Sequence, residues 1–322
     1  MPNPTPHPTW NILDSSKIQE YMDCPRKYFY KYILGWRADI PQQALVFGEA
    51  WHAAMDSLYE IGFTENGVNA AKERFEQLYR LEFSQETDDL YHPKSLWNAF
   101  EAIELYALQY ARYIQDYEVV EIEVAGTVPI GYEGARLSFR IDKILRHKKT
   151  GKFYVIEHKT TGRGGRQWND QWILSTQVGV YTHALYCLYP IDLVYGVIVD
   201  GVIFTKKDIK FERVLCERTP EQMAVWLQNT RDWQERIDID TYTIRWCNED
   251  TRESEPLKCF MMNTQSCTKY WGCEFHDFCM SWINPLSHID DVPIGFREEF
   301  WNPIEHTEKL ARKIVELYKK GI

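Results

Sequence analysis

The sequence predicts an α/β protein in which a mixed central sheet is flanked by helices. Over the first 117 residues, apolar side chains recur mainly at the three- and four-residue spacing of amphipathic helices. From residue 118, segments that alternate polar and apolar residues take over, and helical segments separate and follow them. The resulting order of helices, three strands, a helix, two strands and a helix is typical of a sheet covered by helices.

We expect three regions: a helical region over residues 1–117, an α/β core over residues 118–240, and a Cys-rich segment with a closing helix over residues 241–322. The first predicted helix begins at Asp14 or Ser15, either of which can act as an N-cap, and it stops at Gly35. Helices are expected at residues 15–34, 43–59, 68–81, 95–117, 170–188, 220–237 and 298–319. Strands are expected at residues 119–128, 136–147, 152–160, 193–205 and 208–217.

A charged hairpin is the most informative feature of the sequence. Residues 136–145 alternate polar and apolar side chains, so Arg140 and Asp142 share the polar face of a predicted strand. The polar residues 147–151 end in glycine and predict a tight turn into the next strand. That strand carries Glu157 and Lys159 two positions apart, so both side chains project from one face.

This hairpin predicts a site for a divalent cation. Neighbouring antiparallel strands lie about 5 Å apart, which can bring Asp142 beside Glu157. Two adjacent carboxylates repel each other unless a cation lies between them, and oxygen ligands suit Mg²⁺ or Mn²⁺. The alternative is a surface hairpin with salt-bridged charges. The combination of an acid, a turn, a second acid and a lysine favours the metal site.

Asp142 together with Glu157-His158-Lys159 resembles the motif of the PD-(D/E)XK nuclease superfamily. Further motifs, which occur in the family's order, resemble its RecB-like branch, a group that includes CRISPR-associated and phage RecB-like exonucleases. They are a capped helix running into Cys24-Pro25, a Gly48-x-x-x-His52 motif, a Gln177-x-x-x-Tyr181 motif, and the cysteines Cys267, Cys273 and Cys279. Together these motifs span Ser15 to Cys279.

The resemblance implies a restriction-endonuclease-like core and a metal-dependent DNA nuclease, an exonuclease that acts on single-stranded DNA or DNA ends. Under this hypothesis, His52, Asp142, Glu157 and the main-chain carbonyl of His158 hold Mg²⁺ or Mn²⁺. Lys159 then positions or deprotonates the attacking water, or stays charged and stabilises the phosphate in the transition state. Hydrolysis would leave a 5′-phosphate and a 3′-hydroxyl.

Gln177 and Tyr181 are four residues apart and therefore share a helix face. The resemblance places both in the catalytic site, where the tyrosine could stack on a base or bond a phosphate. The glutamine could hold a phosphate or orient Lys159. On the residue pattern alone, the pair would be the polar edge of a core-packed helix, and His52 would be an ordinary helix residue.

Eight cysteines are too few for a disulfide scaffold in a chain of 322 residues, and their clustering favours ligation of a metal or cluster in a reducing compartment. Cys267, Cys273 and Cys279 are each separated by five residues. The resemblance nominates Cys24 as the fourth ligand of a [4Fe–4S] cluster. The alternative is a structural Zn²⁺ site that uses Cys259. We expect the rest, Cys187, Cys216 and Cys247, to be ordinary thiols.

The net charge of −10 argues mildly against a nucleic-acid role, because phosphate binding depends on lysine and arginine. A local basic surface is nevertheless sufficient, and Arg163 and Arg166 follow the predicted catalytic strand in a Gly-rich loop where they could meet a DNA backbone. No uninterrupted apolar run is long enough to span a membrane, and no signal-peptide pattern opens the chain, so we expect a cytoplasmic protein.

Two other functions remain open at this stage. The chain could be a non-catalytic DNA-binding or assembly subunit that keeps a nuclease fold, or a zinc-stapled structural protein whose acids are incidental. Partner proteins in helicase complexes, DNA repair and recombination, or CRISPR adaptation are all compatible with the resemblance.

Overall fold

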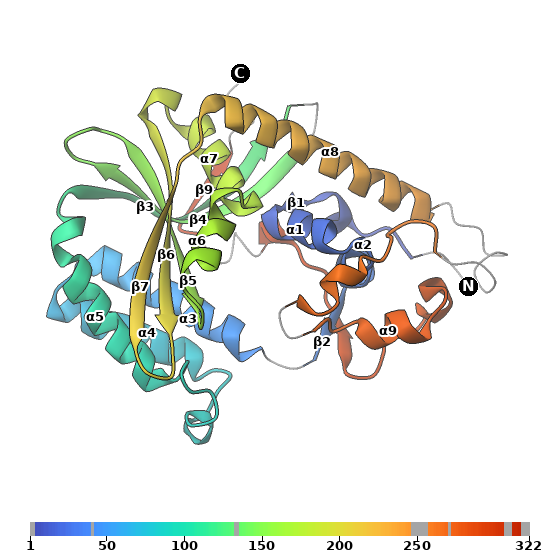
Figure 1. Cartoon of the computed structure of the whole chain (residues 1–322), viewed down its shortest axis with the longest axis horizontal. Helices are drawn as coiled ribbons and strands as arrows, with labels where there is room; N and C mark the ends of the chain where they lie inside the picture. Colours follow the sequence, from blue (N-terminus) through green and yellow to red (C-terminus); the bar gives the residue numbers. More distant parts are fainter. Residues whose placement is uncertain are drawn as a thin grey trace. The chain divides into compact units, whose positions relative to one another are not determined.

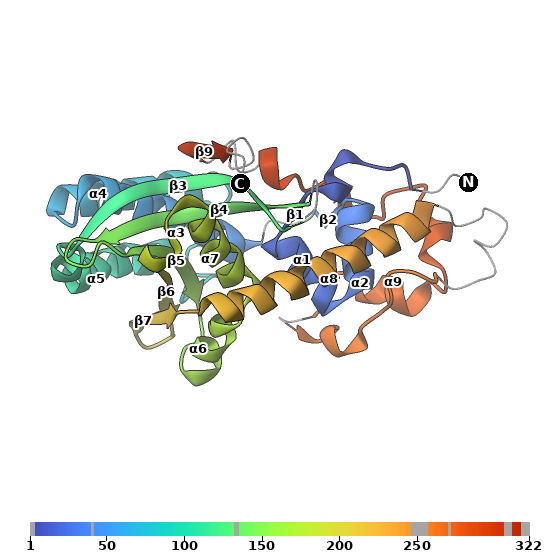
Figure 2. The same ribbon diagram turned by 90° about the horizontal axis from the view of Figure 1, so that it is seen from above.

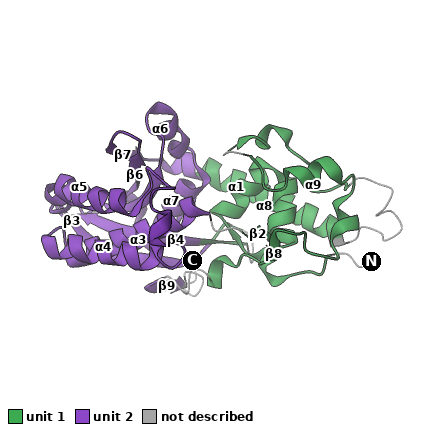
Figure 3. Cartoon of the chain, turned by 90° about the horizontal axis from the view of Figure 1, so that it is seen from below, with its two compact units in different colours: residues 1–40, 129–138, 224–306 green, residues 41–128, 139–223, 307–322 purple. Residues whose placement is uncertain are grey.

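The computed structural model describes residues 4–39, 42–131, 135–245, 257–269, 272–305 and 311–316. The chain folds as two compact units, each drawn from three segments (Figure 3). Unit 1 comprises residues 1–40, 129–138 and 224–306, and unit 2 comprises residues 41–128, 139–223 and 307–322. Cys24 and His52, which we expected in one N-terminal region, therefore lie in different units.

The helices of unit 2 follow the predicted order closely. They are α3 (Gln43–Ile61), α4 (Glu65–Tyr79), α5 (Leu96–Ile114), α6 (Arg166–Ile173) and α7 (Thr176–Leu188). Helices α3, α4 and α5 lie together (Figure 1). The single helix expected over residues 170–188 is instead two, because the Ser175 hydroxyl accepts a hydrogen bond from the Val178 N–H and so starts α7 as a new helix.

A mixed sheet forms the centre of the fold, as predicted. Six of its seven strands are β3 (Tyr117–Pro129), β4 (Arg136–His147), β5 (Phe153–Thr161), β6 (Val194–Phe204), β7 (Ile209–Cys216) and β9 (Lys313–Glu316), in the order β7–β6–β5–β4–β3–β9 (Figure 1). The β4–β5 and β6–β7 pairs are antiparallel, whereas β5–β6 and β3–β9 are parallel.

The closing helix expected over residues 298–319 is borne out only in part, since residues 303–305 are helical but the described residues 298–302 and 311–316 are not. Residues 313–316 form β9, which pairs in parallel with residues 124–127 of β3 (Figure 2). The β-branched Ile314 and Val315 suit a strand, and Gly126 lets the two backbones approach, since a Cβ there would lie 2.4 Å from the Val315 carbonyl oxygen. Pairing with a distant strand thus overrides local helical spacing, while residues 306–310 and 317–322 lie outside the described residues.

The core of unit 2 is rich in aromatic side chains and lies between the sheet and helices α3, α4 and α5. Phe47 makes edge-on contacts with Phe75 of α4 and with Phe204 of β6, with ring centroids 5.1 Å apart in both pairs. Strand residues including Leu145, Ile156 and Ile198 extend this core. Its largest fully buried members are Phe47, Trp51, Phe75, Tyr79, Tyr106 and Phe204.

Unit 1 contains α1 (Ser15–Asp23), α2 (Pro25–Tyr28), a π-helical turn at Phe29–Ile33, most of α8 (Pro220–Arg245) and α9 (His276–Ser281). Strand β1 (Leu13–Asp14) pairs with the first residues of β4, and β2 (Trp36–Ala38) pairs with β8 (Phe296–Glu298). The helix expected over residues 15–34 breaks at Cys24, whose extended backbone is the conformation favoured before a proline.

None of the helices in the described part of the chain is long and apolar enough to cross a membrane.

Truncation of Phe75 tests the aromatic core. Phe75 is fully buried, so Phe75→Ala should lower the free energy of unfolding by about 3–5 kcal/mol, because the cavity left behind cannot be refilled. Urea unfolding measures the change. The control is Leu108→Ala on α5, where the side chain is 80% exposed and a change of no more than about 0.5 kcal/mol is expected. Equal losses in both variants would contradict the placement of this core.

Candidate active site and cysteine group

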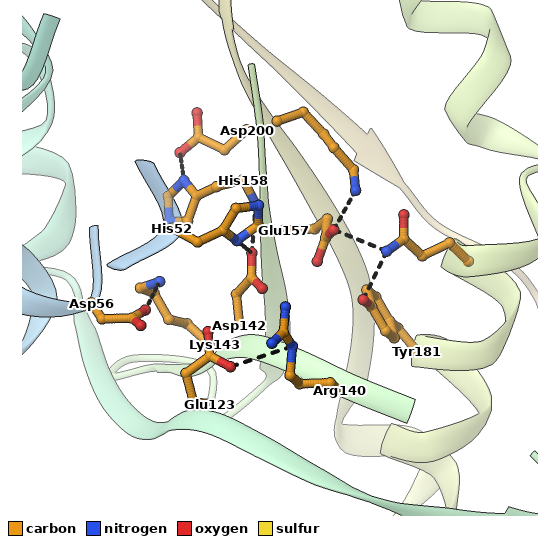
Figure 4. Close-up of polar contacts among 12 residues, drawn as sticks. His52, Asp56, Glu123, Arg140, Asp142, Lys143, Glu157, His158, Tyr181 and Asp200 are labelled. Carbon is orange, nitrogen blue, oxygen red and sulfur yellow. Dashed lines mark hydrogen bonds and ion pairs between the residues drawn. The ribbon is translucent and has the colours of Figure 1, made fainter. Parts of the chain in front are cut away.

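The predicted hairpin is confirmed. Strands β4 and β5 pair from Lys143–Ile156 to Arg146–Phe153, and the turn closes through a 2.9 Å hydrogen bond from the His147 N–H to the Lys152 carbonyl. Beyond the last of these pairs, the Asp142 carboxylate accepts the His158 N–H at 2.9 Å (Figure 4). The Asp142 side chain therefore bonds the backbone of β5 at His158, which lies between Glu157 and Lys159.

Helix α3 holds His52 against this carboxylate. His52 Nδ1 lies 2.9 Å from Asp142 Oδ2, and one turn later Asp56 accepts a 2.8 Å hydrogen bond from Lys143 Nζ. Because His52 and Asp56 are four residues apart, they share a helix face that meets two consecutive residues of β4. The sequence pattern did not identify the Asp56–Lys143 pair, since neither residue belongs to a motif.

These contacts perturb the pKa values of both partners. Burial opposes the charged form of Asp142, but the His52 and Lys143 cations dominate and hold the pKa of Asp142 well below its usual range. Burial also works against the His52 cation, yet the adjacent Asp142 carboxylate raises the pKa of His52 above its usual value. Glu157 changes in the opposite direction to Asp142, since burial and the Asp142 charge both raise the pKa of Glu157.

The second acid is held by groups from β5 and α7. Glu157 Oε1 accepts hydrogen bonds from Lys159 Nζ at 2.6 Å and from Gln177 Nε2 at 2.9 Å. Gln177 also contacts the Tyr181 hydroxyl at 2.8 Å. The structure thus brings together the residues that we expected on neighbouring elements, Glu157, Lys159, Gln177 and Tyr181. Gln177, however, orients Glu157 and not Lys159. Glu157 Oε2 is buried and has no hydrogen-bond partner among the described residues.

Two further charged residues, which the sequence did not single out as functional, lie beside the acids. Arg140 of β4 has its Nε 3.5 Å from Glu123 Oε2 of β3 (Figure 4). Burial raises the pKa of Glu123 to about 8, and the charges of Asp142 and Asp56 act in the same direction. Glu123 also has a backbone φ of +51°, which is uncommon for a residue other than glycine.

On the other face of β5, the His158 imidazole is fully buried beside Asp200 of β6, at 3.9 Å. Asp200 Oδ2 accepts hydrogen bonds from the Tyr106 hydroxyl at 2.6 Å and from Arg213 at 2.8 Å. Burial, aided by the Lys143 cation, places the pKa of His158 well below its usual value. The imidazole is therefore part of the core, and only the main-chain carbonyl of His158 remains a candidate ligand.

Of the two arginines expected to contact DNA, Arg163 lies in the exposed loop after β5 and Arg166 is the first residue of α6. Arg166 forms an ion pair with Asp170 one turn along α6, with its Nε 3.3 Å from Oδ2. Arg163 donates its backbone N–H to the Thr161 hydroxyl at 3.1 Å. The Glu212 carboxylate accepts the Gly165 N–H, so an acid lies against the same loop. Contact with a phosphate backbone stays a prediction for both arginines.

The four cysteines nominated as cluster ligands come together in unit 1. Cys24, Cys267 and Cys273 each interact electrostatically with Cys279, which α9 carries. Burial raises the pKa of Cys279 to about 11, while the nearby Arg26 cation acts in the opposite direction. Cys24 Sγ also accepts the Asn263 N–H at 3.4 Å.

The remaining cysteines lie elsewhere. Cys187 and Cys216 belong to unit 2, whereas Cys259 is buried in unit 1 within electrostatic range of Tyr21. Cys247 is outside the described residues.

Among the described residues, no three His, Cys, Asp or Glu side chains are arranged around a single metal ion. In the active-site group the side chains contact one another directly, through His52–Asp142 and Lys159–Glu157. The donor set nevertheless fits a hard divalent cation, because it contains two carboxylates, one of which keeps a buried oxygen without a hydrogen-bond partner in the described structure.

Comparison with known families matches residues 15–279 to the PD-(D/E)XK nuclease superfamily. No curated protein matches the chain. Among solved structures 16 chains match. One of them, titled "Crystal structure of SSO0001", is 13% identical, with 68% of this chain and 82% of that chain covered and a TM-score of 0.26.

The two histidines should make opposite contributions to the pH dependence of stability. Below about pH 6.5, the unfolded chain binds a proton at His158 that the folded chain does not, so the free energy of unfolding falls as the pH falls. His52 behaves inversely, since its folded-state pKa is raised. Its contribution is complete below about pH 6.5 and is lost as the pH rises through the folded-state pKa.

We therefore expect His158→Gln to reduce the loss of stability on acidification from pH 6.5 to 5, and His52→Gln to reduce the loss above pH 6.5. Urea unfolding in the presence of a chelator, at half-unit intervals of pH, measures both slopes. The two variants serve as controls for each other, because the same substitution is made at each site. Parallel pH profiles for both variants and the wild type would contradict these assignments.

Proposed function

Because the chain belongs to the PD-(D/E)XK nuclease superfamily, we propose that it is a metal-dependent deoxyribonuclease, an exonuclease acting on single-stranded DNA or DNA ends. The observation that carries this proposal is the convergence of His52, Asp142, Glu157 and Lys159 within unit 2. The products are a 5′-phosphate and a 3′-hydroxyl. A site with two adjacent acids and an amine has little value for a purely structural protein.

His52, Asp142, Glu157 and the main-chain carbonyl of His158 would hold Mg²⁺ or Mn²⁺. When bound, such a cation polarises the scissile phosphate and lowers the pKa of a coordinated water. The imidazole of His52 favours Mn²⁺ somewhat more than a set of oxygen ligands alone would. The buried Glu157 Oε2, which has no hydrogen-bond partner in the described part of the chain, and the Asp142 carboxylate supply the hard oxygens that either ion requires.

The other residues orient the acids and handle charge. Gln177 bonds Glu157 Oε1 and so fixes the rotation of that carboxylate. Lys159 is tied to the same oxygen, but its side chain remains about a quarter exposed, at 26%. Its ammonium can therefore reach a substrate, where it donates a hydrogen bond to the attacking water or to a phosphate oxygen that gains charge. Tyr181 is 5% exposed, so its role is to support Gln177 through the hydroxyl and not to stack on a base.

Substitution of the second acid and the lysine tests this function. Glu157→Gln and Lys159→Met should each lower Mn²⁺- or Mg²⁺-dependent degradation of end-labelled DNA by about 10²–10⁴-fold, since each removes a charged group from the reacting centre. Glu104→Gln on α5 is the control, because this exposed carboxylate pairs with Lys72 away from the site, and its activity should equal that of the wild type. Full activity in either active-site variant would refute the assigned roles. DNA binding by the wild type without cleavage would favour a non-catalytic subunit.

We also propose that Cys24, Cys267, Cys273 and Cys279 bind a [4Fe–4S] cluster. Zinc–sulfur bonds of about 2.3 Å would require the sulfurs to lie roughly 3.8 Å apart around one tetrahedral ion. No such group occurs among the described residues. An iron–sulfur cubane instead holds each thiolate on a different iron, so its sulfurs lie farther apart.

The surroundings of these four cysteines support a cluster. Arg26 and Lys27 lie within electrostatic range of Cys279 and Cys273 respectively and would offset the negative charge of the ligated group. Phe278 of α9 stacks on Trp282 and makes edge-on contacts with Tyr30 and Trp36, and these rings together supply an apolar shell. The cluster would link α1 and α2 to the segment around α9 within unit 1.

Anaerobic purification with metal analysis tests the cluster. We expect a brown wild-type protein with about four irons per chain, and loss of iron and colour in Cys24→Ser and Cys279→Ser. Cys187→Ser is the matched control, since Cys187 lies in unit 2, and it should keep its iron. A colourless wild-type protein that contains zinc would contradict the proposal and support the structural zinc alternative.

A further inference from the structure

Arg140 lies on the active-site side of β4. It precedes Asp142 by two residues on the same strand, so the two side chains project from one face. Its guanidinium is in electrostatic range of Asp142, Glu157 and Tyr181 (Figure 4). A group that binds next to both acids must therefore come close to this cation.

The terminal nitrogens of Arg140 are open to a ligand. Its one polar contact among the described residues is the 3.5 Å approach of Nε to Glu123 Oε2. A guanidinium carries five N–H donors in a planar fork, and four of them are on the terminal nitrogens. The side chain is 25% exposed, and its terminal nitrogens are not among the buried polar atoms without a hydrogen-bond partner in the described structure.

The other cations near the acids are already paired. Lys159 donates to Glu157 at 2.6 Å, Lys143 is fully buried against Asp56 at 2.8 Å, and His52 lies 2.9 Å from Asp142. A phosphodiester that binds beside the two acids needs hydrogen-bond donors that do not already bond a carboxylate. Within the described structure, Arg140 is the cation beside the two acids that retains them. Its fork also matches two phosphate oxygens better than a lysine does.

Glu123 is built to orient this arginine. The carboxyl is 5% exposed and lies on β3, where the positive φ of +51° costs folding free energy for a residue with a side chain. Strained backbone of this kind persists where a particular side-chain position is required, and it clusters at functional sites. The strained residue here is the one that contacts Arg140 Nε and leaves the terminal fork exposed.

We propose that Arg140 donates hydrogen bonds to the non-bridging oxygens of the scissile phosphate, and that Glu123 is the positioning residue that aims it. This inference rests on the nuclease function proposed above and adds a substrate contact to it. No group is transferred to Arg140, which stays charged throughout the reaction and stabilises the additional negative charge of the transition state.

The test uses Arg140→Gln, Arg140→Lys and the control Arg146→Gln, an exposed arginine at the far end of the same strand. Single-turnover cleavage is measured with Mn²⁺ on an oligonucleotide that carries one phosphorothioate of defined stereochemistry at the cleaved position. Mn²⁺ tolerates sulfur, so the remaining effect of the substitution reports on contacts made by the protein. Binding of the normal oligonucleotide is measured separately with Ca²⁺.

We expect Arg140→Gln to lower the cleavage rate by about 10²–10³-fold and to lose the sensitivity of the wild type to one phosphorothioate isomer. Arg140→Lys should recover only part of the rate, because a lysine cannot bond two oxygens in the same plane. Arg146→Gln should behave as the wild type. A rate for Arg140→Gln within twofold of the wild type, or an unchanged phosphorothioate effect, would overturn the assignment.

The Glu123→Gly variant distinguishes a role of Glu123 in positioning Arg140 from a role in stabilising the fold. Glycine accepts the positive φ without strain, so the midpoint of thermal unfolding should not fall, while the cleavage rate should fall and Ca²⁺-supported DNA binding should weaken less. Glu123→Gln, which keeps an oxygen beside Arg140 Nε, should retain more activity than Glu123→Gly. Full activity in Glu123→Gly would refute the positioning role.

A wild-type protein that cleaves no DNA would refute the nuclease proposal, whereas an active wild type with an equally active Arg140→Gln refutes the Arg140 contact alone.

Discussion

The structure of the site depends on one hydrogen bond, from the His158 N–H to the Asp142 carboxylate. It forms beyond the last regular pair of the β4–β5 hairpin, Lys143–Ile156, where a side chain takes the place of a backbone acceptor. Through this bond, one carboxylate oxygen of Asp142 holds in place the strand that carries Glu157 and Lys159. Every other group of the site is arranged around this junction, from His52 on one side to Gln177 on the other.

Two buried charge systems make the junction rigid. On α3, Asp56 binds Lys143, the neighbour of Asp142, so the helix that carries His52 is attached to β4 at two consecutive residues. On the opposite face of β5, Asp200 and Arg213 form a buried pair that also includes Tyr106. Removing one member of such a pair leaves an uncompensated charge in the core. Neighbouring carboxylates repel one another. The buried cations and their partners offset this repulsion and allow the acids to stay close together.

The sequence predicted most of what depends on local pattern. The bounds of β4 at Arg136–His147 match the prediction residue for residue, and the four-residue spacing puts Gln177 and Tyr181 on one face of α7, where Gln177 bonds both Glu157 and Tyr181. Features that depend on distant contacts could not be predicted. Glu123 gains its importance from a backbone conformation and from Arg140 on the next strand, and β9 becomes a strand because β3 offers it an edge. Neither effect leaves a periodic pattern in a single sequence.

The central claim is that Asp142, Glu157 and His52 share one divalent cation. Anomalous diffraction from crystals soaked in Mn²⁺ tests it most directly, because the signal locates the ion without reference to activity. The account predicts one strong peak about 2.1 Å from a carboxylate oxygen of Asp142 and of Glu157, with the imidazole of His52 as a third ligand. A peak bound by other residues, or Mn²⁺ absent from this group at a concentration that supports DNA cleavage, would contradict it.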